Sequence, residues 1–212
     1  EESTIESLIF DIASYIHPEH ILIVDDGSTD ATADLARKSG STVCLHQTNY
    51  GKGHAIQTAI QYGCRKQYEW IIIMDADLQH PPSCLPDFFN AIRENKADVI
   101  IANRTDRHSC MPLHRQLSNG ITSIMVSLVS GTRIRDSQCG YRAVRLEALK
   151  PLKFNEHGFQ VESEMLIKLG KMKNRFAEIP IQTVYKNESS SIHPVRDTLL
   201  FARLFFKSLG WY

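Results

Sequence analysis

The sequence has no excess of charge of either sign. Its 212 residues include 24 Lys plus Arg and 24 Asp plus Glu, so the formal net charge at pH 7 is +0. Proteins that bind nucleic acid through their overall charge carry a clear basic excess. We therefore expect no nucleic-acid partner, and any site that binds anions must be built locally.

Cysteines and long apolar runs are also scarce. The five cysteines (Cys44, Cys64, Cys84, Cys110 and Cys139) are scattered and include no Cys-x-x-Cys pair. This pattern argues against a disulfide framework or a zinc site and favours reduced thiols in the cytoplasm. No stretch approaches the roughly 20 apolar residues that span a bilayer, and no signal peptide is recognisable. The hydrophobic fraction of 42% is that of an ordinary globular protein.

Short β-branched runs alternate with segments of helical periodicity along the first half of the chain. We expect an opening helix, then strands at 21–24, 43–45, 70–74 and 99–101 with helices between them. This alternation predicts βαβ units and a mainly parallel sheet flanked by helices, in one α/β domain. The second half is less regular, with helices expected at 117–129, 162–169 and 197–209, a strand or turn at 138–144 and a strand at 176–184.

Acidic pairs follow two of the predicted strands. Asp25 and Asp26 end the first strand, and Asp75 and Asp77 end the third. Ligands of open parallel sheets bind beyond the carboxyl ends of the strands. Two carboxylates at this spacing suit Mg²⁺ or Mn²⁺ bridging a diphosphate, and Gln79 adds a neutral oxygen. The alternative is that these residues only cap the next helix or turn.

A glycine-rich turn, Gly51-Lys52-Gly53, follows the second predicted strand and opens a helix. It is a weak match to a dinucleotide-binding turn, because Ile56 stands at the third glycine position and the expected acidic residue downstream is missing. Lys52 could face the diphosphate of a nucleotide sugar, or the segment could be only a tight loop.

Four motifs together carry a family resemblance. They are Val24–Asp30 (VDDGSTD), Asn49–Gly53 (NYGKG), Met74–Pro81 (MDADLQHP) and Asp136–Arg142 (DSQCGYR). In this order and spacing they resemble the family-2 glycosyltransferases of GT-A fold, and most closely the dolichol- or polyprenyl-phosphate sugar synthases. The resemblance covers nearly the whole chain. Members begin with a strand before the helix that opens this sequence, so we expect the first strand to be missing here and a short further segment upstream.

The resemblance implies a site for a nucleotide-diphosphate sugar and a divalent cation, Mg²⁺ or Mn²⁺. The implied donor-binding residues are Asp25, Asp26, Asn49, Lys52, Asp75 and Ala76. The implied metal ligands are Asp75, Asp77 and Gln79, which form the Asp-x-Asp motif and its extension.

The resemblance also implies an acceptor site. Arg104 and Arg115 fall in the segment that receives the lipid phosphate in the polyprenyl-phosphate branch. Asp136 matches an acidic position near the reacting centre and, with Asp77, is the expected catalytic residue. Glu164 falls on a helix where the family keeps a carboxylate. One departure is the stretch 187–192 (NESSSI), which replaces a Gly-x-Ser-Lys-type segment of the mannose-transferring synthases and leaves the donor sugar open.

We expect two regions, a GT-A domain at 1–195 and a C-terminal amphipathic helix at 196–212. In that helix Arg196, Arg203 and Lys207 recur on one face beside apolar residues, as in helices that lie on anionic membranes. The alternative is a terminal helix docked on the core with a solvated basic stripe. The first reading predicts a cytoplasmic protein held peripherally on the cytoplasmic face of a membrane.

The expected function is inverting transfer of a hexose from the nucleotide sugar to a polyprenyl phosphate. Such an acceptor is already ionised, so positioning by arginine matters more than a base. With a hydroxyl acceptor, on a polysaccharide or a soluble molecule, Asp136 would have to remove a proton. A sugar-nucleotide-binding module without catalysis is the third alternative, and the retained acidic residues argue against it.

Overall fold

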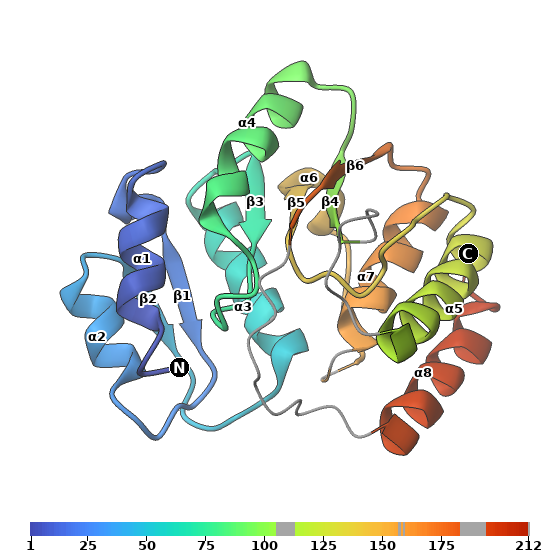
Figure 1. Cartoon of the computed structure of the whole chain (residues 1–212), viewed down its shortest axis with the longest axis horizontal. Coiled ribbons are helices and arrows are strands. Elements are labelled where there is room, and N and C mark those ends of the chain that lie inside the picture. Colours follow the sequence, from blue (N-terminus) through green and yellow to red (C-terminus); the bar gives the residue numbers. More distant parts are fainter. Residues whose placement is uncertain (105–112, 157, 159, 183–193, 212) are drawn as a thin grey trace.

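The structure is a computed structural model of the whole chain, and it describes residues 1–104, 113–156, 158, 160–182 and 194–211, with the backbone alone at 113–115 and 194–199 (Figure 1). The elements in chain order are α1 (Ile5–Ala13), β1 (Leu22–Asp25), α2 (Thr32–Lys38), β2 (Thr42–Leu45), α3 (Lys52–Arg65), β3 (Trp70–Ile73), α4 (Leu85–Glu94), β4 (Val99–Asn103), α5 (Leu113–Ser130), β5 (Arg142–Arg145), α6 (Leu146–Leu149), α7 (Gln160–Lys171), β6 (Phe176–Pro180) and α8 (Pro194–Ser208). Short 3₁₀ turns at Pro18–His20 and Pro82–Cys84 precede β1 and α4.

The first part of the chain forms a two-stranded parallel sheet. β1 pairs with β2 in the register Leu22 to Thr42. α1 contributes Ile5 and Ile9, both 1% exposed, to a small core with Ile21 and Ala36. The opening helix and the first two strands are therefore confirmed, with ends shifted by a residue or two.

The remaining strands form a second, mixed sheet in the order β3-β5-β4-β6. β4 is parallel to β6, but β5 runs antiparallel to both β3 and β4. The expectation of a mainly parallel sheet is therefore wrong at the centre of this sheet, where β5 is antiparallel to both neighbours. β5 lies partly in the segment 138–144, which was expected to be a strand or turn. The reversal arises because the chain leaves α5 through the turn at Asp136–Gly140 and enters the sheet against the direction of its neighbours.

Side chains that alternate along the strands of the second sheet pack into two hydrophobic cores, one on each face of the sheet. Val99 and Ile101 of β4 face a cluster formed with α3, α5, α6 and α7, whereas Ile100 and Ala102 face a cluster with α4. All four side chains are fully buried, as the two-residue period of a strand covered on both faces requires.

The two sheets are not joined by a ladder in the described part of the chain. β1 pairs only with β2, and β3 pairs only with β5. As Figure 1 shows, α1 and α2 flank the smaller sheet, and α5 and α8 lie together at the opposite end. None of the described helices is long and apolar enough to cross a bilayer.

Candidate functional site

Asp25 lies at the carboxyl end of β1 and is 3% exposed. Its Oδ1 accepts a hydrogen bond from the backbone N–H of Ser28 at 2.7 Å, while its Oδ2 has no hydrogen-bond partner among the described residues. Gly27, at φ +81°, makes the turn, and a Cβ there would lie 2.7 Å from the carbonyl carbon of Thr48. The turn therefore brings the Thr48–Gly53 loop against Asp25 and leaves one buried oxygen for a donor from a ligand.

Asp26 holds that loop. The backbone N–H groups of Tyr50 and Gly51 donate to its carboxylate at 3.0 and 2.6 Å, and His46 Nδ1 lies 2.6 Å from Oδ1. Burial alone would raise the pKa of Asp26, but these hydrogen bonds outweigh it and lower the pKa. The structure therefore gives Asp26 a structural task, and direct contact with the nucleoside stays a prediction. Asn49, in the same loop, is exposed.

Lys52, the first residue of α3, joins two acidic residues. Its Nζ lies 2.6 Å from Oδ1 of Asp75 and 2.6 Å from Oε1 of Glu162. Burial lowers the pKa of the ammonium, but the charges of Glu162 and Asp75 outweigh this effect and raise it. Burial raises the pKa of Asp75, but the charge and hydrogen bond of Lys52, together with the charges of His80 and Arg142, outweigh burial and lower the pKa. The glycine-rich turn, a weak motif in the sequence, thus places Lys52 between the two carboxylates of Asp75 and Glu162.

Gly140 lets the main chain approach this cluster. A Cβ at this position would lie 2.4 Å from Oδ2 of Asp75 and 2.9 Å from Oε1 of Glu162. Only a residue without a side chain leaves both carboxylates where they are.

Asp77 differs from Asp75 in having no Lys or Arg partner in the described part of the chain. Its Oδ1 accepts a hydrogen bond from the backbone N–H of Gln79 at 3.0 Å. Burial and the charge of Asp75 raise its pKa, and the nearby His80 opposes them. Two hard carboxylates that repel each other, with one uncompensated, fit a divalent cation. Asp75 and Asp77 would hold it, with Gln79 beside them and Ala76 packed toward the smaller core.

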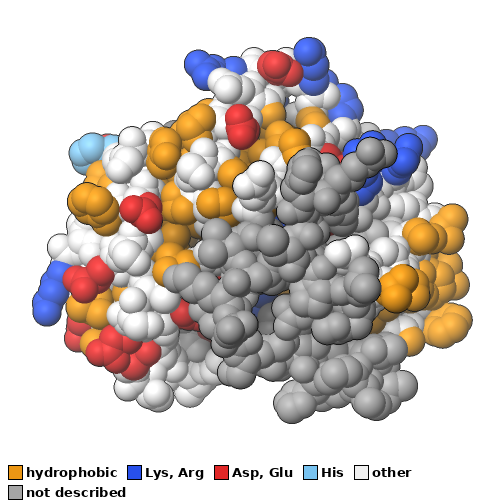
Figure 2. Space-filling view, viewed as in Figure 1, with side chains coloured by type: hydrophobic (Ala, Val, Ile, Leu, Met, Phe, Trp, Pro, Cys, Tyr) orange, Lys and Arg blue, Asp and Glu red, His pale blue; other side chains and the backbone are white. Residues whose placement is uncertain are grey.

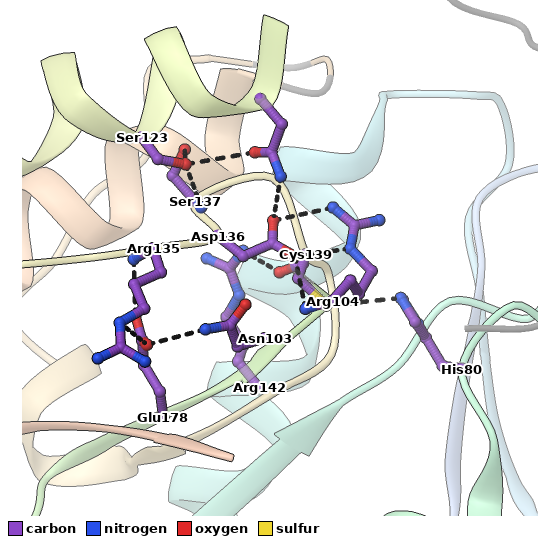
Figure 3. Close-up of polar contacts among 11 residues, drawn as sticks. His80, Asn103, Arg104, Ser123, Arg135, Asp136, Ser137, Cys139, Arg142 and Glu178 are labelled. Carbon is purple, nitrogen blue, oxygen red and sulfur yellow. Dashed lines mark hydrogen bonds and ion pairs between the residues drawn. The ribbon is translucent and has the colours of Figure 1, made fainter. Parts of the chain in front are cut away.

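Asp136 and Arg104 form a buried ion pair (Figure 3). Arg104 Nε donates to Oδ2 at 2.8 Å and Nη2 donates to Oδ1 at 3.0 Å, while Asn119 of α5 donates to Oδ1 at 2.9 Å. Asp136 is 0% exposed. Its burial would raise the pKa, but the Arg104 hydrogen bonds and charge outweigh it and lower the pKa. The structure therefore brings together Arg104 and Asp136, two of the expected site residues, as an ion pair.

Some expected residues lie elsewhere or outside the description. The side chain of Arg115 and the segment 187–192 are among the residues that are not described. Glu164 is fully buried and accepts hydrogen bonds from the backbone N–H groups of Asn155 and Glu156 and from Lys168. It anchors a loop, and Glu162, two residues earlier, is the α7 carboxylate that reaches Lys52.

Sequence reasoning missed Glu162 and Asn119. The signal for Glu162 was its place on the same predicted helix as Glu164, but periodicity did not say which of the two faces the strand ends. Asn119 could have been noticed as a polar residue in a predicted helix, 117–129, that is otherwise rich in apolar residues.

Comparison with known proteins decides the family. The model of glycosyl transferase family 2 matches residues 1–153. The chain belongs to this family. A protein of Methanocaldococcus jannaschii is 32% identical over 199 residues, which cover 88% of this chain and 86% of that protein. An undecaprenyl-phosphate mannosyltransferase of Micrococcus luteus is 30% identical over 184 residues, 81% of this chain and 74% of that enzyme. A dolichol-phosphate mannosyltransferase of Pyrococcus furiosus is 29% identical over 199 residues, 90% of this chain and 55% of that enzyme.

Solved structures confirm the GT-A fold of this family member. Glucosyl-3-phosphoglycerate synthase of Mycobacterium tuberculosis, crystallised with Mn²⁺, UDP and phosphoglyceric acid, superposes with a TM-score of 0.74 at 20% identity. The match covers 99% of this chain and 73% of that one.

Proposed function

We propose that this family-2 glycosyltransferase moves a hexose from a nucleotide-diphosphate sugar to a polyprenyl phosphate, with inversion at the anomeric carbon and with the help of a divalent cation. The names of the relatives support the lipid-phosphate acceptor, since two of them transfer mannose to undecaprenyl or dolichol phosphate. The buried Asp136–Arg104 pair is the structural observation that carries the proposal.

The donor end of the site is assigned to the ends of β1 and β3. The unpartnered Oδ2 of Asp25 would accept a hydrogen bond from an N–H of the base, which would satisfy a buried oxygen at little cost. A cation held by Asp75 and Asp77 would neutralise charge on the departing diphosphate. The ion pair with Lys52 holds the Asp75 carboxylate in place between α3 and the turn at Gly140. The raised pKa of Lys52 keeps its ammonium group charged.

The acceptor end is assigned to Arg104. Asp136 holds the guanidinium through two hydrogen bonds and is itself held by Asn119, so the cation is fixed in orientation before an acceptor arrives. A fully buried carboxylate with a lowered pKa is a poor proton acceptor near pH 7. A phosphate acceptor is already an anion and needs no base. The pair therefore fits a phosphate better than a hydroxyl, with Asp136 as a positioning residue.

The test is transfer kinetics with a short-chain polyprenyl phosphate. Losing one charge-assisted contact costs about 1.5–3 kcal/mol, so we expect Arg104→Ala to raise the acceptor KM at least about tenfold. Asp136→Asn should raise the same KM by loosening Arg104. Arg133→Ala, on an exposed arginine nearby in sequence, is the matched control and should change little. Arg115→Ala is expected to behave like Arg104→Ala.

A hydroxyl acceptor gives a different result. In that case Asp136→Asn would lower kcat by a factor of about 10² to 10⁴ and leave the acceptor KM nearly unchanged. That outcome, or no transfer to any polyprenyl phosphate, would overturn the acceptor assignment. A panel of nucleotide sugars tests the third alternative. If the protein released free sugar from none of them, a binding module without catalysis would be favoured.

A further inference from the structure

The loop between β3 and α4, which carries the proposed metal ligands Asp75 and Asp77, contains a strained residue. Leu78 lies in this loop at φ +60°. Leucine rarely adopts such a left-handed conformation, because its Cβ then crowds the backbone. Residues at unfavourable backbone angles persist only where the surrounding structure fixes them, and they cluster at functional sites. Contacts of residues 75–80, which we call the metal loop, must therefore hold Leu78 in place.

His80, the last residue of the metal loop, closes the loop on itself. The backbone N–H of Asp75 donates to Nδ1 of His80 at 3.3 Å, so a side chain at the end of the loop holds the backbone at its start. A second hydrogen bond, from the backbone N–H of Gln79 to Oδ1 of Asp77 at 3.0 Å, lies within the same loop. Because Nδ1 accepts a hydrogen bond, the proton of the imidazole is on Nε2.

The imidazole of His80 is held in place by packing. Surface histidine is visible in Figure 2 at the left-hand edge of the molecule, but His80 is only 3% exposed. Its ring stacks on the fully buried Tyr141, with the ring centroids 5.3 Å apart. Pro81 and Pro82 follow His80 and restrict the backbone on that side. The position of Nδ1 is therefore fixed by residues outside the metal loop.

His80 also joins the metal loop to the turn before β5. Its Nε2 lies 3.9 Å from Sγ of the fully buried Cys139 (Figure 3). Gly140, the next residue in that turn, approaches Oδ2 of Asp75 so closely that a Cβ would overlap it. The ring thus lies between the backbone of Asp75 and the turn that also carries Asp136.

We propose that His80 is a positioning residue for the divalent cation: it holds the metal loop in the conformation in which Asp75 and Asp77 bind that cation. The proposal rests on the proposed function, in which these two carboxylates are the metal ligands. His80 does not bind the cation itself, since its Nδ1 is engaged by the backbone of Asp75 and its Nε2 faces Cys139. Mutation of such outer residues changes metal affinity by about 10- to 100-fold.

The experiment measures Mn²⁺ affinity from the electron paramagnetic resonance signal of the free ion, in the presence of UDP or GDP, whichever the parent binds. His80→Phe keeps an aromatic ring against Tyr141 but offers no acceptor, and it lowers the Mn²⁺ affinity at least about tenfold. His80→Asn loses the stacked ring but places an amide oxygen near the position of Nδ1. It keeps the affinity within about threefold of the parent, because the hydrogen bond from Asp75 remains.

Leu78 provides an independent test, because a change there alters the metal loop and leaves His80 intact. Leu78→Val places a β-branched residue at φ +60°, where it is less favourable than leucine, and lowers the Mn²⁺ affinity about threefold or more. Leu78→Gly is the matched control, since glycine adopts positive φ without strain, and it keeps the parent affinity.

The outcomes separate this proposal from the proposed function. A parent that binds no Mn²⁺, or Asp77→Asn that binds it as tightly as the parent, overturns the metal assignment and the role of His80 with it. Parent-like Mn²⁺ affinity in folded His80→Phe overturns the role of His80 alone, and so does an equal loss of affinity in His80→Asn and His80→Phe. A purely structural role would lower the stability of both variants in urea and leave their Mn²⁺ affinity unchanged. If His80→Phe does not fold, unchanged affinity in Leu78→Val overturns the proposal.

Discussion

At the scale of single residues, the site depends on how each carboxylate is compensated. Asp75 is paired with Lys52, and Asp136 is paired with Arg104, whereas Asp77 lacks a cationic partner in the described part of the chain. Removing a charge from water is costly when no partner compensates it, and Asp77 is partly buried. The uncompensated Asp77, beside Asp75, is therefore the residue that most directly indicates a divalent cation.

Gly140 gives a residue-scale prediction that separates activity from folding. In Gly140→Ala the new Cβ would overlap Oδ2 of Asp75 and crowd Oε1 of Glu162. Both carboxylates must turn away, and a displacement of about 1 Å in a catalytic group costs on the order of a hundredfold in rate. We expect a loss of that size in kcat, with far-UV circular dichroism unchanged. Normal kcat in this variant would mean that the Asp75 position is not used in transfer.

The limits of sequence reasoning are clearest at this scale. Asp75 and Asp77 were predictable because the strand end fixes where they lie, whatever the rest of the fold does. Glu162 was not, because its meeting with Lys52 joins residues that are 110 positions apart. The role of Gly140 could not be foreseen either, since it depends on contacts from two other elements. The hydrogen bonds by which Asp26 holds its own loop could not be foreseen either, and its contact with the nucleoside stays a prediction.

At the scale of elements, close helix contact sets the place of α5. Gly170 of α7 lies against the end of α5, and a Cβ there would be 2.6 Å from both the Cβ and the carbonyl oxygen of Ser130. Backbone atoms cannot give way as a flexible side chain can. Gly170→Ala should therefore force α5 and α7 apart and lower the free energy of unfolding by about 1–3 kcal/mol.

Gly120 provides the matched control, because it lies within α5 and a Cβ there would meet nothing within 4 Å. Alanine is the better helix former by about 1 kcal/mol, so Gly120→Ala should be neutral or stabilising. Urea unfolding of both variants measures the difference. Equal stability of Gly170→Ala and the parent would show that the two helices are not held at this distance.

Element boundaries were predictable to within a few residues, but element environments were not. The apolar periodicity of α5 predicted a helix over 117–129, and the structure extends it to Leu113–Ser130. Ordinary patterning would have turned Leu117 and Leu128 inward. They face outward because the inner face is taken by Asn119 and Ser123, which the turn before β5 requires. The direction of β5 was unforeseen for a similar reason, since it follows from the path out of α5.

At the scale of the whole molecule, the chain contains two sheets, and the candidate site residues follow strands of both. Asp25 belongs to the smaller sheet, and Asp75 and Asp77 follow β3 of the larger one. No strand ladder joins β1 to β3 in the described residues. A nucleotide that contacts Asp25, with a cation on Asp75 and Asp77, would tie the two parts together. The donor should therefore stabilise the whole molecule and not only the loops that touch it.

This arrangement predicts a thermal shift that depends on nucleotide and Mn²⁺ together. A ligand that binds only the folded state at about 100 times its Kd adds about 2.7 kcal/mol, which is about 5–10 °C in a domain of this size. We expect such a shift with UDP or GDP plus Mn²⁺, whichever base fits Asp25, and a smaller one with either component alone.

Asp77→Asn should keep the shift from nucleotide alone and lose the added shift from Mn²⁺, because an amide lacks the negative charge that binds the cation. Asp87→Asn, on the exposed side of α4, is the control and should respond as the parent does. An equal Mn²⁺ effect in Asp77→Asn would place the cation elsewhere, and additive rather than cooperative shifts in the parent would mean that the nucleotide does not bridge the two sheets.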